Sequence, residues 1–248
     1  MLFERRVLIA MCVLIFANQL GFGAMVPSLP LYAETFGVSA TAIGMAIAVY
    51  GLARFVTALP SGLISDKWGR RPALAIGGLL SALGNFWSVY AEAYPEFLIA
   101  RFVAGAGAGM VVTTGSVVLA DITTKERRGR MIAIYQGSFI FAVGVGPLPG
   151  GVLAQTYGLL APFWFCAVAS LVAGSVALFA VGETRHLAQA KHASGKTLPP
   201  LYEQIRLLWT NIGFMLVSGI GLINALTRTG GLFNIVPIIG SFKVGLDY

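Results

Sequence analysis

The chain consists of long apolar stretches separated by short polar segments. A helix that crosses a membrane needs about 20 mostly apolar residues, and such stretches occur at about 7–31, 40–64, 73–91, 96–120, 131–154, 161–182 and 208–240. Segments such as AVASLVAGSVALFAV lack the alternation of apolar and polar positions that the strands of a membrane barrel show. The pattern therefore predicts an all-α, polytopic membrane protein with seven spanning helices.

Composition supports this class and argues against several others. The chain is 57% apolar and 11% charged, with a mean hydropathy of +0.81, far from the balance of a soluble domain. Cys12 and Cys166 both lie in apolar stretches, and His186 and His192 are too isolated to form a metal site. No nucleotide-binding loop or Ser-His-Asp arrangement is present. We expect no metal, no cofactor and no enzymatic activity.

Basic residues occur in alternate connections between the apolar stretches. They lie at 5–6, 67–71, 125–130 and 183–206, whereas the loops at 32–39, 92–95 and 155–160 contain none. Short cytoplasmic loops carry an excess of Lys and Arg, so the pattern places the N-terminus in the cytoplasm of a multi-pass protein of the plasma (inner) membrane. The net charge of +7 is then an orientation signal, and lipid, not nucleic acid, is the expected partner.

The longest polar stretch, 183–206, divides the chain. It contains Gly, Ser and two prolines, which is typical of a linker. After it, GGLFNIVPIIGSFKVGLD is a weak echo of GFGAMVPSLPLYAETFGVS in the first apolar stretch. We expect a six-helix bundle at 1–182, a cytoplasmic linker at 183–206, and at 207–248 the first helix of an incomplete second half. The chain is expected to be truncated, with the missing C-terminal half as its partner.

The segment 62–71, GLISDKWGRR, places charges between two apolar stretches. A glycine at 62 allows a neighbouring helix to approach closely, Asp66 could accept hydrogen bonds from another helix N-terminus, and a glycine at 69 permits a tight turn. The arginines could pair with Asp121 or with lipid phosphate. The segment resembles the cytoplasmic signature GxxxD[RK]xGRR of the major facilitator superfamily. That resemblance implies a conformational latch made of Gly62, Asp66, Lys67, Gly69, Arg70, Arg71 and Asp121. The alternative, above all for Lys67 and Arg71, is an ordinary solvated loop.

The first apolar stretch ends LGFGAMVPSLP, residues 20–30. This resembles a pattern of twelve-helix drug:proton antiporters within the superfamily. Pro27 and Pro30 interrupt the backbone hydrogen bonds, which is tolerated at membrane depth only where protein or a water-filled cavity shelters the freed groups. We therefore expect Pro27 in a cavity wall, the alternative being that the prolines simply end a helix.

The fourth apolar stretch carries RFVAGAGAGM, with Arg101 and Gly105, and resembles the superfamily's RxxxG pattern. A guanidinium inside the bilayer is costly unless it faces the bundle interior. We expect Arg101 to hydrogen-bond backbone carbonyls near the broken first helix, where it could also shift the pKa of a proton carrier. A purely structural role is the alternative.

The fifth apolar stretch contains GVGPLPGG at 144–151. Its core of Gly146, Pro147, Gly150 and Gly151 resembles the antiporter motif GPxxGG, although two glycines that precede the core in the full pattern are replaced by alanines. The mechanical content is a kinked, closely packed helix that can rock across the interface between the two halves. These residues are therefore assigned to proton coupling or to helix packing.

Several polar groups are predicted at membrane depth, and any of them could line a substrate cavity or merely bond a neighbour. The candidates are Asn18, Gln19, Tyr135, Gln136 and Asn224, together with Arg228 as the best substrate contact of the second half. Arg54 is expected to reach the cytoplasmic face with its long side chain. None of the ten acidic residues lies in the middle third of a predicted span.

The resemblance implies a secondary transporter that moves a small molecule by alternating access between two halves. The leading hypothesis is proton-coupled efflux of a hydrophobic or cationic compound. Uptake or uniport of a polar or anionic metabolite is the alternative, and the positive charges of Arg101 and Arg228 favour an anionic substrate. A third hypothesis, of another class, is a non-transporting membrane fragment or partner-binding half.

Overall fold

The computed structural model describes residues 2–187 and 201–227, and these residues contain helices and no strand. The chain divides into two compact units between residues 191 and 192, inside the predicted linker. Helices α1 to α8 form the first unit, and α10 and α11 belong to the second.

The first unit contains the six spans predicted from its apolar stretches. Their helices are α1 (Leu2–Met25), α2 (Ser28–Glu34), α3 (Ala40–Trp68), α4 (Arg70–Val89), α5 (Tyr94–Ile122), α6 (Lys125–Val145), α7 (Pro147–Tyr157) and α8 (Ala161–Ala180). Six segments are long and apolar enough to cross a membrane, counting α6 and α7 as one. Several helices extend beyond the predicted stretches, because Lys, Arg and Glu are good helix formers outside the apolar region.

Proline interrupts two of the spans. The first span breaks between α1 and α2, where Pro27 precedes Ser28, and the fifth breaks between α6 and α7, where Pro147 follows Gly146. Proline has no backbone N–H to donate and its ring clashes with the preceding turn. Both interruptions occur at prolines that the sequence singles out.

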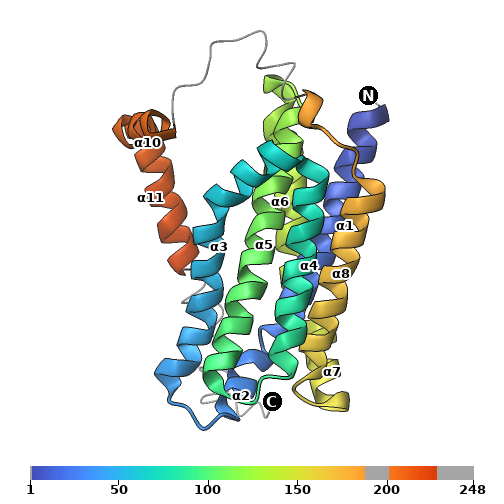
Figure 1. Cartoon of the computed structure of the whole chain (residues 1–248), viewed down its shortest axis with the longest axis vertical. Coiled ribbons are helices and arrows are strands. Elements are labelled where there is room, and N and C mark those ends of the chain that lie inside the picture. Colours follow the sequence, from blue (N-terminus) through green and yellow to red (C-terminus); the bar gives the residue numbers. More distant parts are fainter. Residues whose placement is uncertain (1, 188–200, 228–248) are drawn as a thin grey trace. The chain divides into compact units, whose positions relative to one another are not determined.

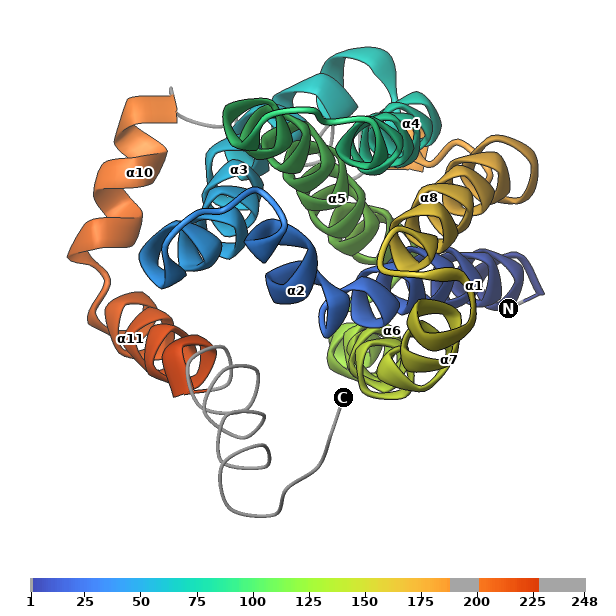
Figure 2. The same cartoon turned by 90° about the horizontal axis from the view of Figure 1, so that it is seen from below.

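Close helix contacts in the first unit depend on small residues. Helix α5 packs between α3 and α4, and α8 packs on α4 and α1 (Figures 1 and 2). A Cβ atom on Gly84 would lie 2.3 Å from the backbone nitrogen of Ala104, and one on Gly107 would lie 2.2 Å from that of Ser81. Larger residues at these glycines would push α4 and α5 apart.

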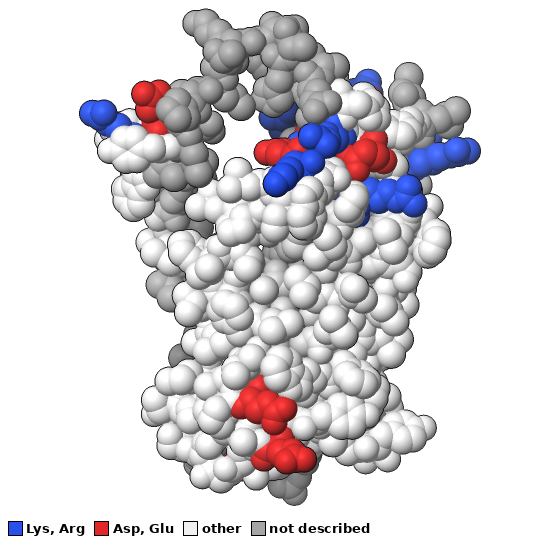
Figure 3. Space-filling model, viewed as in Figure 1, with Lys and Arg blue, Asp and Glu red and all other residues white. Residues whose placement is uncertain are grey.

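Charge is unevenly distributed along the first unit. Within residues 2–187, every Lys and Arg except Arg54 and Arg101 lies at the end where α3 gives way to α4, which we name the basic end. Figure 3 shows these side chains gathered at that end of the unit, with acidic side chains also at the opposite end. The distribution agrees with the alternation seen in the sequence.

The second unit contains α10 (Leu201–Thr210) and α11 (Ile212–Leu226). The seventh predicted span, 208–240, is interrupted at Asn211, whose side chain accepts a hydrogen bond from the backbone N–H of Phe214 at 3.1 Å and so begins a new helix. Residues 201–206 of the predicted linker are helical. The remainder of that span, 228–240, lies outside the described residues.

Candidate functional site

A single residue joins α3 to α4. Gly69 ends α3 and precedes Arg70, the first residue of α4. Its φ of 107° is one that residues with a side chain rarely adopt. A Cβ atom on Gly69 would also lie 2.5 Å from Oε2 of Glu183. Glycine is therefore required at this turn for its backbone conformation and for space, as its place in the predicted latch suggests.

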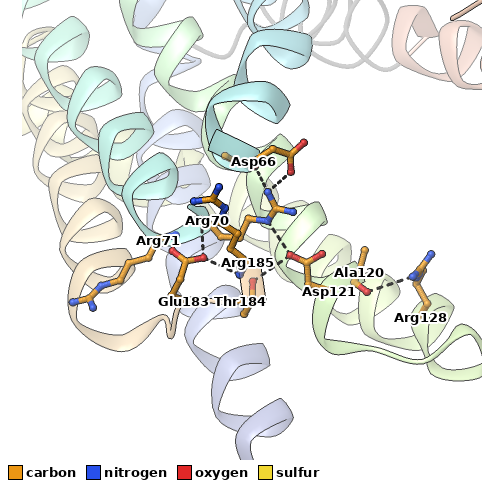
Figure 4. Close-up of polar contacts among 10 residues, drawn as sticks. Asp66, Arg70, Arg71, Ala120, Asp121, Arg128, Glu183, Thr184 and Arg185 are labelled. Carbon is orange, nitrogen blue, oxygen red and sulfur yellow. Dashed lines mark hydrogen bonds and ion pairs between the residues drawn. The ribbon is translucent and has the colours of Figure 1, made fainter. Parts of the chain in front are cut away.

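Arg70 connects three helices at the basic end. Its Nε donates to Oδ2 of Asp121 at 2.8 Å, and its Nη1 donates to Oγ of Ser65 at 3.0 Å and to Oδ1 of Asp66 (Figure 4). Arg70 is 4% exposed and Asp121 is 8% exposed. The structure therefore brings together three of the predicted latch residues, from α3, α4 and α5, around one buried guanidinium.

Glu183 caps the N-terminus of α4. Its carboxylate accepts hydrogen bonds from the backbone N–H groups of Arg70 at 2.9 Å, Arg71 at 3.2 Å and Arg185 at 2.9 Å (Figure 4). The first N–H groups of a helix have no partner within it, and they favour negative charge. Burial by itself raises the pKa of Glu183, but these hydrogen bonds outweigh it and hold the pKa below the ordinary value. Glu183 is thus a charged cap on α4.

Sequence reasoning missed Glu183 and Thr184, which it assigned to the linker. Thr184 is fully buried and its Oγ1 donates to Oδ2 of Asp121 at 3.3 Å. An acidic residue directly after an apolar stretch, at the end that carries the unpaired α4 N-terminus, is a signal that could have identified Glu183. We call Ser65, Asp66, Arg70, Asp121, Glu183 and Thr184 the Arg70 cluster.

The other predicted latch residues are more exposed. The Asp66 side chain is 66% exposed and pairs with Arg70, so it does not make the expected contact with the N-terminus of another helix in the described residues. Lys67 and Arg71 have exposed side chains. A Cβ atom on Gly62 would meet nothing within 4 Å, so the expected close approach of a helix to Gly62 is absent within the first unit.

Arg101 is almost completely buried, with an exposure of 1%. Its Nη1 donates to Sδ of Met25 at 3.2 Å and to Oδ1 of Asn85 at 3.4 Å. Its Cζ lies 4.4 Å from the centroid of the Tyr50 ring, a cation–π contact. Both hydrogen bonds go to side chains, so within the described residues Arg101 does not bind the freed backbone carbonyls that the sequence led us to expect.

The motif glycines pack within the first unit. A Cβ atom would lie 2.4 Å from O of Tyr50 if built on Gly105, 2.6 Å from Gly23 if built on Gly146, and 2.0 Å from O of Ala24 if built on Gly150. One on Gly151 would meet nothing within 4 Å. Gly146 and Gly150, on either side of the start of α7 at Pro147, therefore pack on α1 of the same unit, which agrees with their assignment to helix packing.

The predicted cavity residues differ in how far they are buried. Asn18 and Gln19 are buried on α1, where Nε2 of Gln19 donates to Oδ1 of Asn18 at 3.0 Å. Tyr135 is fully buried, and its hydroxyl has no hydrogen-bond partner among the described residues. Gln136 and Pro27 are exposed.

Two predicted cavity residues belong to the C-terminal part of the chain. Asn224 lies on α11 and is exposed. Arg228 lies outside the described residues.

Arg54 does not lie where the sequence placed it. It occupies the middle of α3, about 21 Å from either end at 1.5 Å per residue. Its Cζ is 5.9 Å from the ring centroids of both Tyr50 and Phe139. Tyr50 and Phe139 both lie near the middle of their spans, so the Arg54 side chain packs there and not at a membrane face as expected.

Comparison with known proteins identifies the family. A sequence profile described as the Major Facilitator Superfamily matches residues 11–248. The chain belongs to this superfamily. With six apolar spanning helices in the described residues, it is a multi-pass integral membrane protein of a family of transporters, which are not enzymes.

Relatives within the superfamily are of modest similarity. An uncharacterized MFS-type transporter of Methanocaldococcus jannaschii is 29% identical over 161 residues, which are 65% of this chain and 42% of that protein. The quinolone resistance protein NorA of Staphylococcus aureus is 27% identical over 163 residues, 64% of this chain and 41% of NorA. The part of this chain that matches thus covers somewhat less than half of the length of these two relatives.

Solved structures share the fold of this superfamily member. The human organic anion transporter MFSD10 superposes with a TM-score of 0.64 at 21% sequence identity. The match covers 73% of this chain and 48% of MFSD10. At this identity the likeness concerns the arrangement of helices alone.

Proposed function

We propose that the chain is part of a secondary transporter that moves a small molecule across the membrane by alternating access, with the Arg70 cluster as its latch. The observation that carries the proposal is the buried guanidinium of Arg70, which ties α3, α4 and α5 together at the basic end. Membership of the superfamily supports the transport activity. The distribution of Lys and Arg supports a cytoplasmic basic end and N-terminus.

The exposed part of the cluster explains how a latch could open. Asp66 keeps most of its carboxylate exposed although it touches Arg70, and no helix of the first unit covers Gly62, one turn away on α3. A helix of the second half can approach Gly62 in one state and present its N-terminus to Asp66. In the other state it withdraws, and Asp66 remains paired with Arg70 alone. The same charges would then serve both states.

For direction and substrate, we propose proton-coupled export of a hydrophobic compound. Export is supported by the similarity to NorA, which is a quinolone resistance protein, and by the GPxxGG core at 146–151. All acidic residues in 2–187 lie at or near helix ends. The proton carrier is therefore assigned to another part of the protein. For the same reason, the middle of these spans provides no acidic residue that could bind a cationic substrate.

Uptake or uniport of an anionic metabolite is the second candidate. The specific observation in its favour is that Arg54 and Arg101 lie within the spans. It differs from the first candidate in its direction and in its independence of a proton gradient.

Reconstitution into proteoliposomes tests both candidates. A fluorescent quinolone is enclosed with and without an imposed pH gradient, and its movement is timed against protein-free liposomes. Export of the compound that becomes faster as protons enter supports the first candidate. A rate of movement that is the same with and without the pH gradient supports the second. A rate equal to that of protein-free liposomes for the quinolone and for a panel of organic anions contradicts transport altogether.

A further inference from the structure

Arg54 lies near the middle of the first unit, measured along the length of its helices. A Cβ atom on Gly109, near the middle of α5, would lie 2.9 Å from Cα of Arg54, and Phe139 contacts it from the middle of the fifth span. Its position on α3 and its neighbours on α5 and α6 therefore all place Arg54 near the middle of the membrane. The hydrocarbon core is about 30 Å thick, so lipid phosphates lie about 15 Å from its centre, well beyond the reach of an arginine. A lipid headgroup is not the partner of Arg54.

The charge of Arg54 is uncompensated in the part of the chain that the structure describes. The ion pairs found there join Arg70 to Asp66 and Asp121, and Arg127 to Glu4, and none includes Arg54. A charged side chain at this depth is costly, and where it occurs it usually marks a substrate or ion pathway. The position therefore requires an explanation beyond packing.

The contacts of Arg54 leave its hydrogen-bonding groups available. The rings of Tyr50 and Phe139 face its guanidinium, and such cation–π contacts use the charge but not the N–H donors in the plane. No hydrogen bond from the guanidinium reaches another residue within 2–187 or 201–227. The side chain is partly exposed.

Arg101 also lacks an ion pair in the described residues, and its Nε has no hydrogen-bond partner there, but it differs from Arg54 in its burial and in the hydrogen bonds of its Nη1. It is 1% exposed, it already donates to Met25 and Asn85, and its guanidinium covers the same Tyr50 ring at 4.4 Å. Tyr50 is further fixed by stacking on Phe22, with centroids 5.0 Å apart. Arg101 thus positions the aromatic ring, and Arg54 offers free donors beside it.

We infer that Arg54 binds an anionic group of the transported compound, a carboxylate or a phosphate, while Tyr50 and Phe139 contact its apolar body. The planar fork of arginine matches two oxygens of such a group, and the surrounding rings suit an aromatic or aliphatic remainder. The inference rests on the proposed transport function and narrows its hydrophobic substrate to an amphipathic anion. An acid elsewhere in the protein that pairs with Arg54 is the competing explanation.

A matched pair of ligands tests the inference by binding alone. Binding of 1-naphthoate and of its neutral isostere 1-naphthamide to the purified protein in detergent is followed by tryptophan fluorescence. Arg54→Gln should weaken naphthoate binding by about tenfold or more, as expected for loss of a charged bidentate contact, and naphthamide binding by less than about twofold. Arg54→Lys, which keeps the charge without the fork, should fall between Arg54→Gln and the wild type. Arg130→Gln, an exposed arginine near the start of α6, is the control and should leave both affinities unchanged.

Other outcomes would overturn the inference. One is that Arg54→Gln weakens the binding of naphthoate and naphthamide equally. Another is that this variant binds naphthoate as tightly as the wild type does. A third is that the wild type does not bind naphthoate at millimolar concentration. Size-exclusion profiles show whether each variant is folded, and if Arg54→Gln is not, Arg54→Lys alone must lose naphthoate selectively.

Transport of the same two compounds separates this inference from the proposed function. If naphthoate binding depends on Arg54 but neither compound moves across proteoliposomes, the anion site stands and the transport proposal fails. If the protein transports solutes but binds both ligands equally well with and without Arg54, transport stands and the anion site fails.

Discussion

Arg70 and Asp121 form the most buried ion pair among the described residues. Nε of Arg70 lies 2.8 Å from Oδ2 of Asp121, and the two side chains are 5% and 10% exposed. Breaking such a pair by removing one partner leaves a charge that neither water nor another group can fully compensate. The pair therefore makes the Arg70 cluster a structural element as well as a candidate latch.

Replacing Asp121 with Asn should destabilise the protein. The amide has nearly the same size but no charge, so Arg70 retains only the largely exposed Asp66 as an acidic partner. We expect a loss of about 3 kcal/mol in the free energy of unfolding, the lower end of the range for a broken buried pair. Thermal unfolding in detergent measures it. Glu92→Gln, at an exposed residue of the α4–α5 connection, should change stability by less than about 0.5 kcal/mol, and equal melting temperatures for the two variants would contradict the argument.

Replacing Asp66 with Asn should affect transport more than stability. Its side chain is 66% exposed, and exposed pairs contribute less than about 1 kcal/mol. If Asp66 receives a helix N-terminus of the second half in one state, loss of its charge should slow turnover several-fold with little change in unfolding temperature. Initial rates in proteoliposomes, compared with melting curves of the same preparation, measure both quantities. Wild-type turnover in this variant would exclude the latch role of Asp66.

Glu183 should make stability depend on pH. Its pKa is lowered in the folded protein, because hydrogen bonds to the α4 N-terminus outweigh the effect of burial. The stabilisation is therefore present above the ordinary glutamate pKa of about 4.3 and is lost as the pH falls through the lowered value. The difference in melting temperature between wild type and Glu183→Gln should be largest near neutral pH and shrink below about pH 4. A difference that stays constant down to pH 3 would show that the charge of Glu183 does not matter.

Much of the fold follows from the sequence, because lipid imposes simple rules. A span must be apolar for its whole length, and this fixed the six spans of the first unit. Proline cannot continue the helical ladder, so the interruptions at Pro27 and Pro147 could be placed in advance. A glycine turn at Gly69 was also expected from local chemistry, and Asp121 was one of the two partners expected for the arginines.

The remainder of the candidate site depends on which face each helix presents, which apolar length does not reveal. Arg54 was expected near a membrane face, but α3 continues to Trp68 and places it in the middle. Gln136 and Tyr135 are neighbours, yet one is exposed and the other fully buried, because rotation about α6 separates them. Glu183 follows its helix in an irregular segment, and its cap on α4 exists only after α4 and α8 have packed together.

Gly150 and Gly151 provide a matched test of helix packing at the second proline break. Both lie on α7, but a Cβ atom on Gly150 would be 2.0 Å from O of Ala24, whereas one on Gly151 would meet nothing within 4 Å. Gly150→Ala must therefore displace α7 from α1 and should cost about 1–3 kcal/mol, as overpacking does in other cores. Gly151→Ala should be neutral or stabilise by up to about 1 kcal/mol, because alanine favours a helix over glycine. Melting temperatures in detergent distinguish the two. If the variants melted together, α1 and α7 could separate without loss, and the contact between Gly150 and Ala24 would not hold this part of the bundle.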